Sequence, residues 1–201
     1  MSIEFFAIIL LTALVAYLIG SIPTGYLIVK IKTGQDIRQI GSGSTGATNV
    51  KRVLGKKWFF IVMLLDAFKG ALPVLLAKLF IADVFGIFAV VASIFVIIGH
   101  SKPIYLQFRG GKSVASGVGT ILALNWVVGL SIALIWGVIT YVSKYVSLGS
   151  IIALACAPFL MYYFKNPIGY VVYAGIAALY IIYLHRENIK RLIKGEENKV
   201  R

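Results

Sequence analysis

The chain alternates long apolar runs with short polar segments. Crossing the hydrocarbon core of a bilayer takes about 20 helical residues, so the longer runs predict transmembrane helices, and the three shortest need flanking residues or a tilt into a thin, protein-lined site. The pattern predicts an all-α, polytopic integral membrane protein with seven transmembrane helices. The runs cover residues 5–29, 58–80, 84–99, 113–124, 126–142, 150–163 and 168–184.

Two details of this count depend on flanking residues. The first run follows Glu4 without a basic leader and is long enough to span, so it is interpreted as a helix of the folded protein rather than a signal peptide. Residues 113–142 are preceded by Lys112 and followed by Lys144. Both flanks belong inside only if the chain crosses twice, with a turn near Asn125.

Composition supports the same class. The 201 residues are 60% hydrophobic and only 13% charged, which is typical of one membrane-embedded domain covering residues 1–201. The net charge of +13 suggests membrane orientation and anionic lipid as a partner. Because no basic, aromatic-interleaved soluble module accompanies it, nucleic acid is not an expected partner. Cys156 is alone in an apolar run, which leaves no disulfide or thiolate metal site.

The basic residues predict an orientation. With seven crossings, an outer N-terminus and a cytoplasmic C-terminus, 17 of the 20 Lys and Arg residues fall in inner segments. Of the exceptions Lys69, Lys78 and Lys165, only Lys165 lies clearly in an outer loop. Three polar clusters between the runs are therefore expected on the cytoplasmic face.

The first cluster reads Gly-Ser-Gly-Ser-Thr-Gly-Ala-Thr-Asn over residues 41–49 and is followed by Arg52. Glycines let the backbone approach an anion, Ser42 and Thr48 offer hydroxyl donors, and the guanidinium of Arg52 matches a phosphate group. A flexible linker would explain the glycines and serines but not the attached Arg52. We predict that Ser42, Thr48 and Arg52 bind phosphate.

The second cluster is Gly110-Gly111-Lys112, at the start of the fourth run. A nucleotide P-loop is excluded, because the required upstream glycine is Leu106 and no strand precedes it. Glycines at a helix N-terminus would present unsatisfied N–H groups to an anion, and Lys112 would add a cation. The alternative is a lysine that only sets topology, which would not require two glycines.

The third cluster contains His185, with Asn188 three residues later on the same helical face. Beside Arg186 and Arg191, this histidine is either a proton acceptor or an ordinary interfacial residue. His100 presents the same choice in a weaker setting.

Serines at the start of the sixth run and a charged pair within the second complete the candidates. Ser147 reads as an ordinary N-cap, whereas Ser150 is ambiguous. Asp66 and Lys69 lie three residues apart on one helical face, either as a mutually neutralising structural pair or as support for an active site or transport route.

Missing motifs narrow the chemistry. No Gly-x-Ser-x-Gly sequence occurs, so a serine acyl-enzyme is not expected. The inner-face carboxylates are too scattered to build a magnesium site, and this favours metal-free chemistry. They are Asp36, Glu187, Glu196 and Glu197.

Taken together, the clusters resemble the bacterial acyl-phosphate-dependent glycerol-3-phosphate acyltransferases, the PlsY family. Three motifs agree in order along nearly the whole chain: residues 41–52, residues 99–112 and residues 185–192. The chain departs from many members at Ser44-Thr45, where Asn followed by a variable residue is common, and at Ser113, where Gly is common.

The resemblance implies a seven-helix enzyme of the bacterial inner membrane with a cytoplasmic active site. It would transfer a fatty acyl group from acyl phosphate to the 1-hydroxyl of glycerol 3-phosphate, release lysophosphatidate and phosphate, and need no cofactor. An upstream enzyme that forms acyl phosphate is an expected functional partner. The resemblance places in binding and catalysis the residues Ser42, Arg52, Lys112, Ser150, His185 and Asn188.

Two questions stay open at this point. Either His185 or a substrate phosphate oxygen takes the proton of the attacking hydroxyl. A transporter or flippase for an organic phosphate is the rival class, but it needs polar contacts near the midplane, for which only Asp66 and Lys69 are candidates. A lipid-binding scaffold would not require the glycines.

Overall fold

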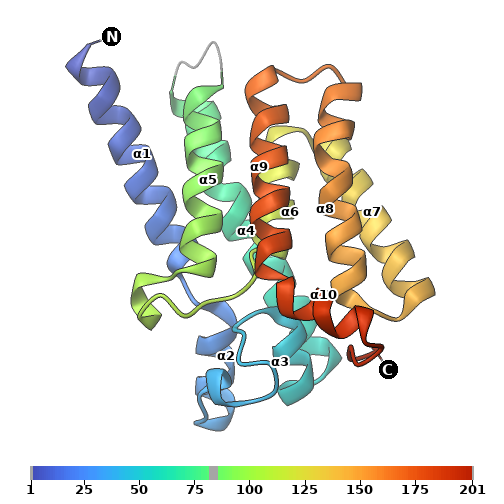
Figure 1. Cartoon of the computed structure of the whole chain (residues 1–201). Coiled ribbons are helices and arrows are strands. Elements are labelled where there is room, and N and C mark those ends of the chain that lie inside the picture. Colours follow the sequence, from blue (N-terminus) through green and yellow to red (C-terminus); the bar gives the residue numbers. More distant parts are fainter. Residues whose placement is uncertain (1, 82–85, 201) are drawn as a thin grey trace. The chain divides into compact units, whose positions relative to one another are not determined.

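A computed structural model describes residues 2–81 and 86–200, and within these ranges the chain forms helices joined by loops, with no β-strand (Figure 1). The all-α prediction is therefore confirmed for the described residues. The α-helices are α1 Ile3–Ser21, α2 Thr24–Thr33, α3 Ala47–Leu54, α4 Lys56–Phe80, α5 Ile87–Ser101, α6 Val114–Leu124, α7 Trp126–Ser143, α8 Val146–Tyr163, α9 Ile168–Leu184 and α10 Arg186–Ile193, with 3₁₀ turns η1 Ile37–Gln39 and η2 Ile104–Leu106.

Length and apolarity identify the candidate membrane spans among these residues. Five segments qualify, and the bent pair of α9 and α10 makes a sixth. The remaining apolar helix, α6, has only 11 residues. A multi-pass helical protein is thus supported, and the count of seven spans stays a prediction. The predicted start of the third run, at residues 84 and 85, lies outside the described residues.

The chain forms two compact units, the first ending at Thr120 and the second beginning at Ile121. The interpretation of residues 1–201 as one membrane-embedded domain stays a prediction.

The first apolar run differs from the unbroken helix that its hydropathy predicts. The helix stops at Ser21, and α2 begins at Thr24. Pro23 causes this interruption, because it has no N–H to donate and disfavours helical backbone at Ile22 before it. The break turns the backbone carbonyl of Ile22 toward α4, where it accepts a hydrogen bond from the side chain of Lys69 at 2.7 Å.

Small residues bring α1 and α5 together in the first unit. A side chain at Gly20 would overlap the backbone of Val96, and one at Gly99 would overlap the backbone of Tyr17. Close backbone approach through small residues is a common way for helices to associate in a membrane. The hydroxyl of Tyr17 adds a hydrogen bond to the Lys102 carbonyl at 2.9 Å and fixes the chain where it leaves α5.

In the second unit, α8 packs against both α7 and α9. Asn125 caps α7 by accepting a hydrogen bond from Val128 N–H, and its amide donates to Asn166 Oδ1 at 2.9 Å. The predicted turn near Asn125 is therefore confirmed. At the other end of α9 the chain bends by 62° at His185 into α10.

Candidate active site

The side chain of Asn49 organises the first polar cluster. Its Oδ1 accepts a hydrogen bond from Ser42 N–H at 3.1 Å. Its Nδ2 donates to the carbonyl oxygens of Ile37, Ile40 and Ser44, at 3.3, 2.9 and 2.9 Å. The side chain is buried, so these bonds compete with no solvent and hold the loop in one conformation. The cluster is a built loop rather than a flexible linker.

This loop places the three predicted phosphate-binding residues on a common framework. Ser42 lies exposed on the loop beside Asn49. Thr48 and Arg52 lie on α3, one helical turn apart, and Arg52 is exposed. An added Cβ at Gly41 would lie 3.4 Å from Arg52 Cδ, so the stem of Arg52 passes over the loop.

Arg38, just before the first cluster, is hydrogen-bonded to the segment that leads to the second cluster. Arg38 donates to both carboxylate oxygens of Asp36, with a shortest distance of 2.6 Å, and also to the carbonyl of Leu106 at 3.3 Å. The hydrogen bond from Arg38 outweighs burial and lowers the pKa of Asp36 below its ordinary value. Because Leu106 belongs to the segment that leads to Lys112, both clusters lie at the same end of the first unit.

The two glycines of the second cluster pack against the end of α5. The N–H of Gly110 donates to the Ser101 carbonyl at 3.2 Å, and that of Gly111 to the His100 carbonyl at 3.1 Å. A side chain at either glycine would overlap His100. The expectation that these N–H groups are unsatisfied is therefore wrong, since both are bound to α5. Close packing explains the glycines, and it fixes the segment from which half-buried Lys112 projects.

Ser113 connects this turn to α6 in a strained conformation. Its φ is 58°, in the left-handed region that favours glycine. The buried hydroxyl donates to the Ile97 carbonyl at 2.7 Å and offsets part of the strain. The helix begins at Val114, so the N–H groups of its first turn follow directly after Lys112.

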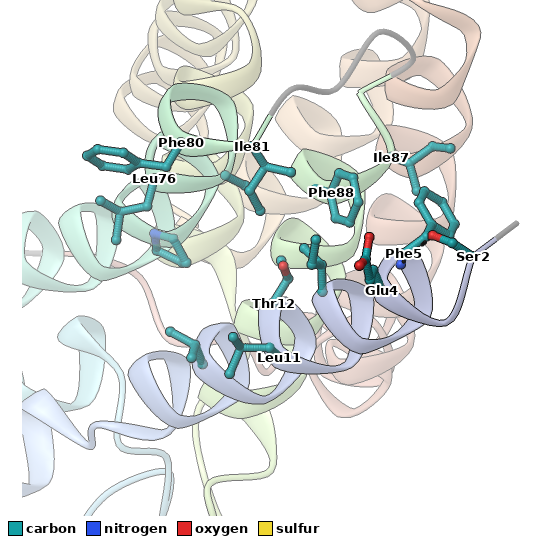
Figure 2. A pocket seen from close by; sticks show the side chains of 14 residues that line it. Ser2, Glu4, Phe5, Leu11, Thr12, Leu76, Phe80, Ile81, Ile87 and Phe88 are labelled. Atoms are coloured by element: carbon teal, nitrogen blue, oxygen red, sulfur yellow. Dashed lines mark hydrogen bonds between the residues drawn. The ribbon is translucent and has the colours of Figure 1, made fainter.

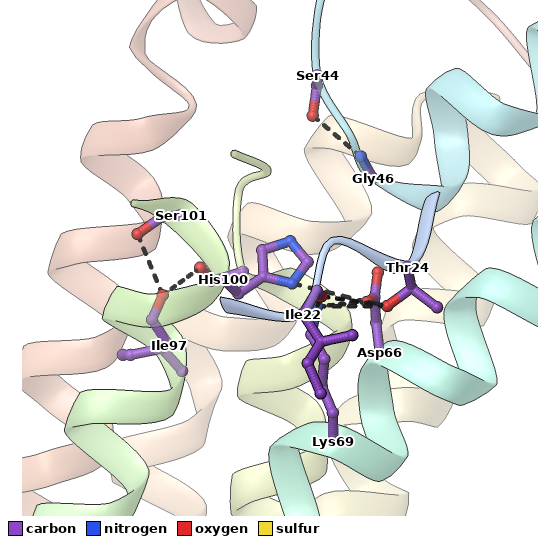
Figure 3. A network of polar contacts seen from close by, with 10 residues as sticks. Ile22, Thr24, Ser44, Gly46, Asp66, Lys69, Ile97, His100 and Ser101 are labelled. Carbon is purple, nitrogen blue, oxygen red and sulfur yellow. Dashed lines mark hydrogen bonds and ion pairs between the residues drawn. The ribbon is translucent and has the colours of Figure 1, made fainter. Parts of the chain in front are cut away.

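Behind the second cluster lies a buried polar network that contains the predicted charged pair (Figure 3). Lys69 Nζ lies 2.8 Å from Asp66 Oδ1, which also accepts a hydrogen bond from Thr24 Oγ1 at 2.8 Å. His100 Nδ1 lies 3.8 Å from the same carboxylate oxygen. Asp66 and Lys69 therefore form a mutual ion pair.

In the second unit, His185 ends α9 and begins α10, and its side chain is buried. Its Nδ1 lies 2.8 Å from the Ile181 carbonyl oxygen. Since a carbonyl can only accept, Nδ1 carries the proton in this contact. In the neutral ring the basic lone pair is then on Nε2.

The third cluster includes a residue that the sequence reasoning missed. Glu197 accepts hydrogen bonds from Ser147 Oγ at 2.9 Å, Asn188 Nδ2 at 2.7 Å and Arg191 Nε at 2.7 Å. Burial favours the neutral acid, but these three donors together lower the pKa of Glu197 below its ordinary value. The carboxylate fixes the amide of Asn188 and joins α10 to the start of α8.

Ser150 lies one helical turn after Ser147 on α8 and is buried. Its hydroxyl donates to the carbonyl of Val146 at 2.8 Å, a bond within its own helix. The hydroxyl oxygen can accept a further hydrogen bond. Through Glu197, which contacts both Ser147 and Asn188, Ser150 lies at the same end of the second unit as Asn188.

The structure thus gathers the predicted residues into two groups. The first unit carries Ser42, Thr48, Arg52, Gly110, Gly111 and Lys112, and the second carries Ser150, His185 and Asn188. A groove of about 820 Å³ contains none of them. It is mostly apolar and lies at the other end of the first unit, between α1, α4 and α5 (Figure 2).

Residues 10–195 match the family described as glycerol-3-phosphate acyltransferase. The chain belongs to this family. A glycerol-3-phosphate acyltransferase of Gloeobacter violaceus is 43% identical over 92% of this chain and 91% of its own. One from Clostridioides difficile is 42% identical over 98% of this chain and 97% of its own.

Solved structures of an integral membrane glycerol-3-phosphate acyltransferase, PlsY (YgiH), are also similar. Its glycerol 3-phosphate form matches with a TM-score of 0.90 and 39% identity, over 96% of both chains. Its lysophosphatidic acid form matches with a TM-score of 0.87 and 37% identity, over 96% of this chain and 95% of that one. The resemblance seen in the sequence motifs is confirmed.

For this acyltransferase family member, the roles of two residues became visible only in the structure. Asn49 was visible as part of the first motif, but its place at the centre of the loop depends on the fold. Glu197 stood in a charged tail with no local signal. Among the described residues no group of three or more His, Cys, Asp and Glu side chains could hold a metal ion.

Proposed function

We propose that this chain transfers a fatty acyl group from acyl phosphate to the sn-1 hydroxyl of glycerol 3-phosphate, giving lysophosphatidate and inorganic phosphate. The observation that carries the proposal is the match, over 96% of the chain, to an integral membrane acyltransferase solved in glycerol 3-phosphate and lysophosphatidic acid forms. The donor is inferred from the motif resemblance. Arg52 and Lys112 supply two separate cations, as two phosphate-bearing substrates require.

The remaining site residues have orienting roles in this proposal. Arg52, with Ser42 and Thr48, binds one phosphoryl group, and Lys112 binds the other at the Gly110-Gly111 turn. Because the N–H groups of both glycines are hydrogen-bonded to α5, their part is to set the path of the backbone rather than to donate directly. Ser150 and Asn188 orient the reacting groups. Holding both substrates in a reactive geometry supplies most of the rate gain.

The chemical step is a direct transfer. The glycerol 3-phosphate hydroxyl oxygen attacks the acyl carbonyl carbon, the bond from that carbon to the phosphate oxygen breaks, and phosphate leaves with the electron pair. The hydroxyl proton passes either to His185 Nε2 or to a substrate phosphate oxygen. The hydrogen bond between His185 Nδ1–H and Ile181 supports the first route, since it leaves the basic lone pair on Nε2.

We place the protein in the bacterial inner membrane with seven spans, an outer N-terminus and a cytoplasmic C-terminus and active site. The distribution of Lys and Arg supports this topology. Seven spans require that α6, with only 11 residues, crosses as a short span surrounded by protein. Reporter fusions at the two termini should report opposite sides of the membrane; two cytoplasmic signals would contradict an odd number of crossings.

The activity is tested with purified protein, palmitoyl phosphate and glycerol 3-phosphate. Lysophosphatidate and phosphate should appear together, whereas product formation from acyl-CoA alone would contradict the donor assignment. Lys112→Ala should lower turnover by about a hundredfold or more. Lys165→Ala, in the turn between α8 and α9, is the matched control and should retain wild-type turnover.

A further inference from the structure

His100 joins the buried network of Thr24, Asp66 and Lys69 (Figure 3) to the glycines of the second cluster. Asp66 and Lys69 lie on α4 and His100 on the last turn of α5, and all three side chains are buried. Charged and polar groups at membrane depth are costly, so each one needs an identifiable partner or task.

The ion pair already has its partners without the histidine. Asp66 Oδ1 accepts from Lys69 Nζ and from Thr24 Oγ1, and Lys69 also donates to the Ile22 carbonyl. These contacts fasten α4 to the break between α1 and α2. They satisfy the polar groups that the break exposes, which is a structural task.

His100 adds no hydrogen bond to this pair. Its Nδ1 lies 3.8 Å from Asp66 Oδ1, and the described part of the chain offers Nδ1 no hydrogen-bond partner. The ring lies beside the carboxylate without a hydrogen bond to it, and its opposite edge, which carries Nε2, points elsewhere.

That opposite edge lies against Gly111. A Cβ added to Gly111 would overlap His100 Nε2, and the Gly111 N–H donates to the His100 carbonyl at 3.1 Å. A Cβ added to Gly110 would overlap the same carbonyl oxygen. His100 thus contacts the turn with both its ring and its backbone, immediately before Lys112.

We propose that His100 is a positioning residue for phosphate binding. With Asp66 beside its Nδ1, the ring supports the Gly110-Gly111 turn at Nε2 and fixes the direction in which Lys112 meets a substrate phosphoryl group. The inference rests on the proposed function, in which Lys112 binds that group. His100 acts through the turn and has no role in the proton transfer.

Two conservative replacements of His100 distinguish the role of Nδ1 from that of Nε2. The amide of an asparagine reaches about as far as Nδ1 of the histidine, and the amide of a glutamine reaches about as far as Nε2. First, Lys112→Arg identifies the substrate whose KM depends on Lys112. His100→Asn should then raise the KM for that substrate by about tenfold or more, with kcat and the other KM changed by less than about threefold. His100→Gln should restore the KM to within about threefold of wild type.

Gly111→Ala provides a second test that does not depend on recovery of His100→Asn. The added methyl should displace the ring and raise the same KM. Combining Gly111→Ala with His100→Ala, which removes the overlapping ring, should cause no further rise, because the two changes act on one contact. If the KM of the double variant instead rose by the product of the two single-variant increases, the proposal would be overturned.

Ser93→Ala is the matched control, because Ser93 is buried on α5 with its hydroxyl bonded to Ala89. Its kinetics should equal those of wild type. If wild type transfers acyl groups and His100→Asn keeps a wild-type KM, or if Asn and Gln variants raise both KM values equally, the positioning role is wrong while the activity stands. A wild-type protein without acyl transfer would instead contradict the proposed function.

Discussion

At the scale of single residues, the side chain of Asn49 makes the hydrogen bonds that hold the first cluster together. Replacing it with Ala leaves Ser42 N–H and three carbonyl oxygens without their partner, and should destabilise the protein by about 2–4 kcal/mol. Asn49→Asp keeps the acceptor for Ser42 but turns an oxygen toward the carbonyls. We expect it to be at least as destabilising as Ala when thermal unfolding is measured in one detergent. A melting temperature equal to that of wild type in either variant would show that the Asn49 side chain does not hold the loop in place.

Glu197 gives a prediction that depends on pH. Its pKa is lowered in the folded protein. The ionised carboxylate therefore stabilises the fold at any pH above the ordinary glutamate pKa of about 4.5. This stabilisation is lost as the pH falls through the lowered pKa of the folded protein. On acidification, the melting temperature of wild type should therefore fall more than that of Glu197→Gln. Glu196→Gln, on the neighbouring exposed side chain, is the control and should follow wild type. Parallel acid profiles for all three would show that Glu197 is not held as a carboxylate.

These two residues also show where sequence reasoning ends. The hydroxyls, glycines and cations of the clusters are visible because phosphate binding requires those side-chain types in short segments. The contacts of Asn49 and Glu197 are set by how the chain returns on itself. Glu197 meets Ser147 across 50 positions, a contact with no local pattern.

At the scale of elements, hydropathy predicted most helices because membrane spans are long and strongly apolar. The break at Pro23 had a local signal in the proline itself, but the apolar run continued across it and concealed the boundary. The short helix α3 was not predicted, since the Gly- and Ser-rich segment before it hides a start at Ala47. The return of Glu197 toward α8 after the end of α10 was not predicted either, because only tertiary contacts hold it.

Helix packing in the first unit gives a prediction at the same scale. Gly20→Ala should force α1 away from Val96 on α5 and cost about 1–3 kcal/mol. Gly137 on α7 is the matched control, because an added Cβ there meets nothing within 4 Å. Gly137→Ala should leave stability within about 1 kcal/mol of wild type or raise it. Equal thermal unfolding of the two variants in one detergent would contradict the close α1–α5 contact.

At the scale of the whole molecule, sequence and structure agree on the class and diverge on detail. Apolar composition and ordered motifs were enough to predict a helical membrane acyltransferase. The role of Gly110 and Gly111 was not predictable. A glycine that presents its N–H to an anion and a glycine that packs closely against a helix look alike in sequence. Only the contacts with Ser101 and His100 distinguish them.

The proposed function requires direct transfer of the acyl group from bound acyl phosphate, a mixed anhydride, to bound glycerol 3-phosphate, and a single-turnover measurement tests this step. Enzyme is mixed with palmitoyl phosphate in the absence of glycerol 3-phosphate, and phosphate release is followed. We expect no release above the rate without enzyme, and then equal amounts of phosphate and lysophosphatidate once glycerol 3-phosphate is added. A phosphate burst equal to the enzyme concentration before that addition, with the acyl group covalently bound to the protein, would contradict it.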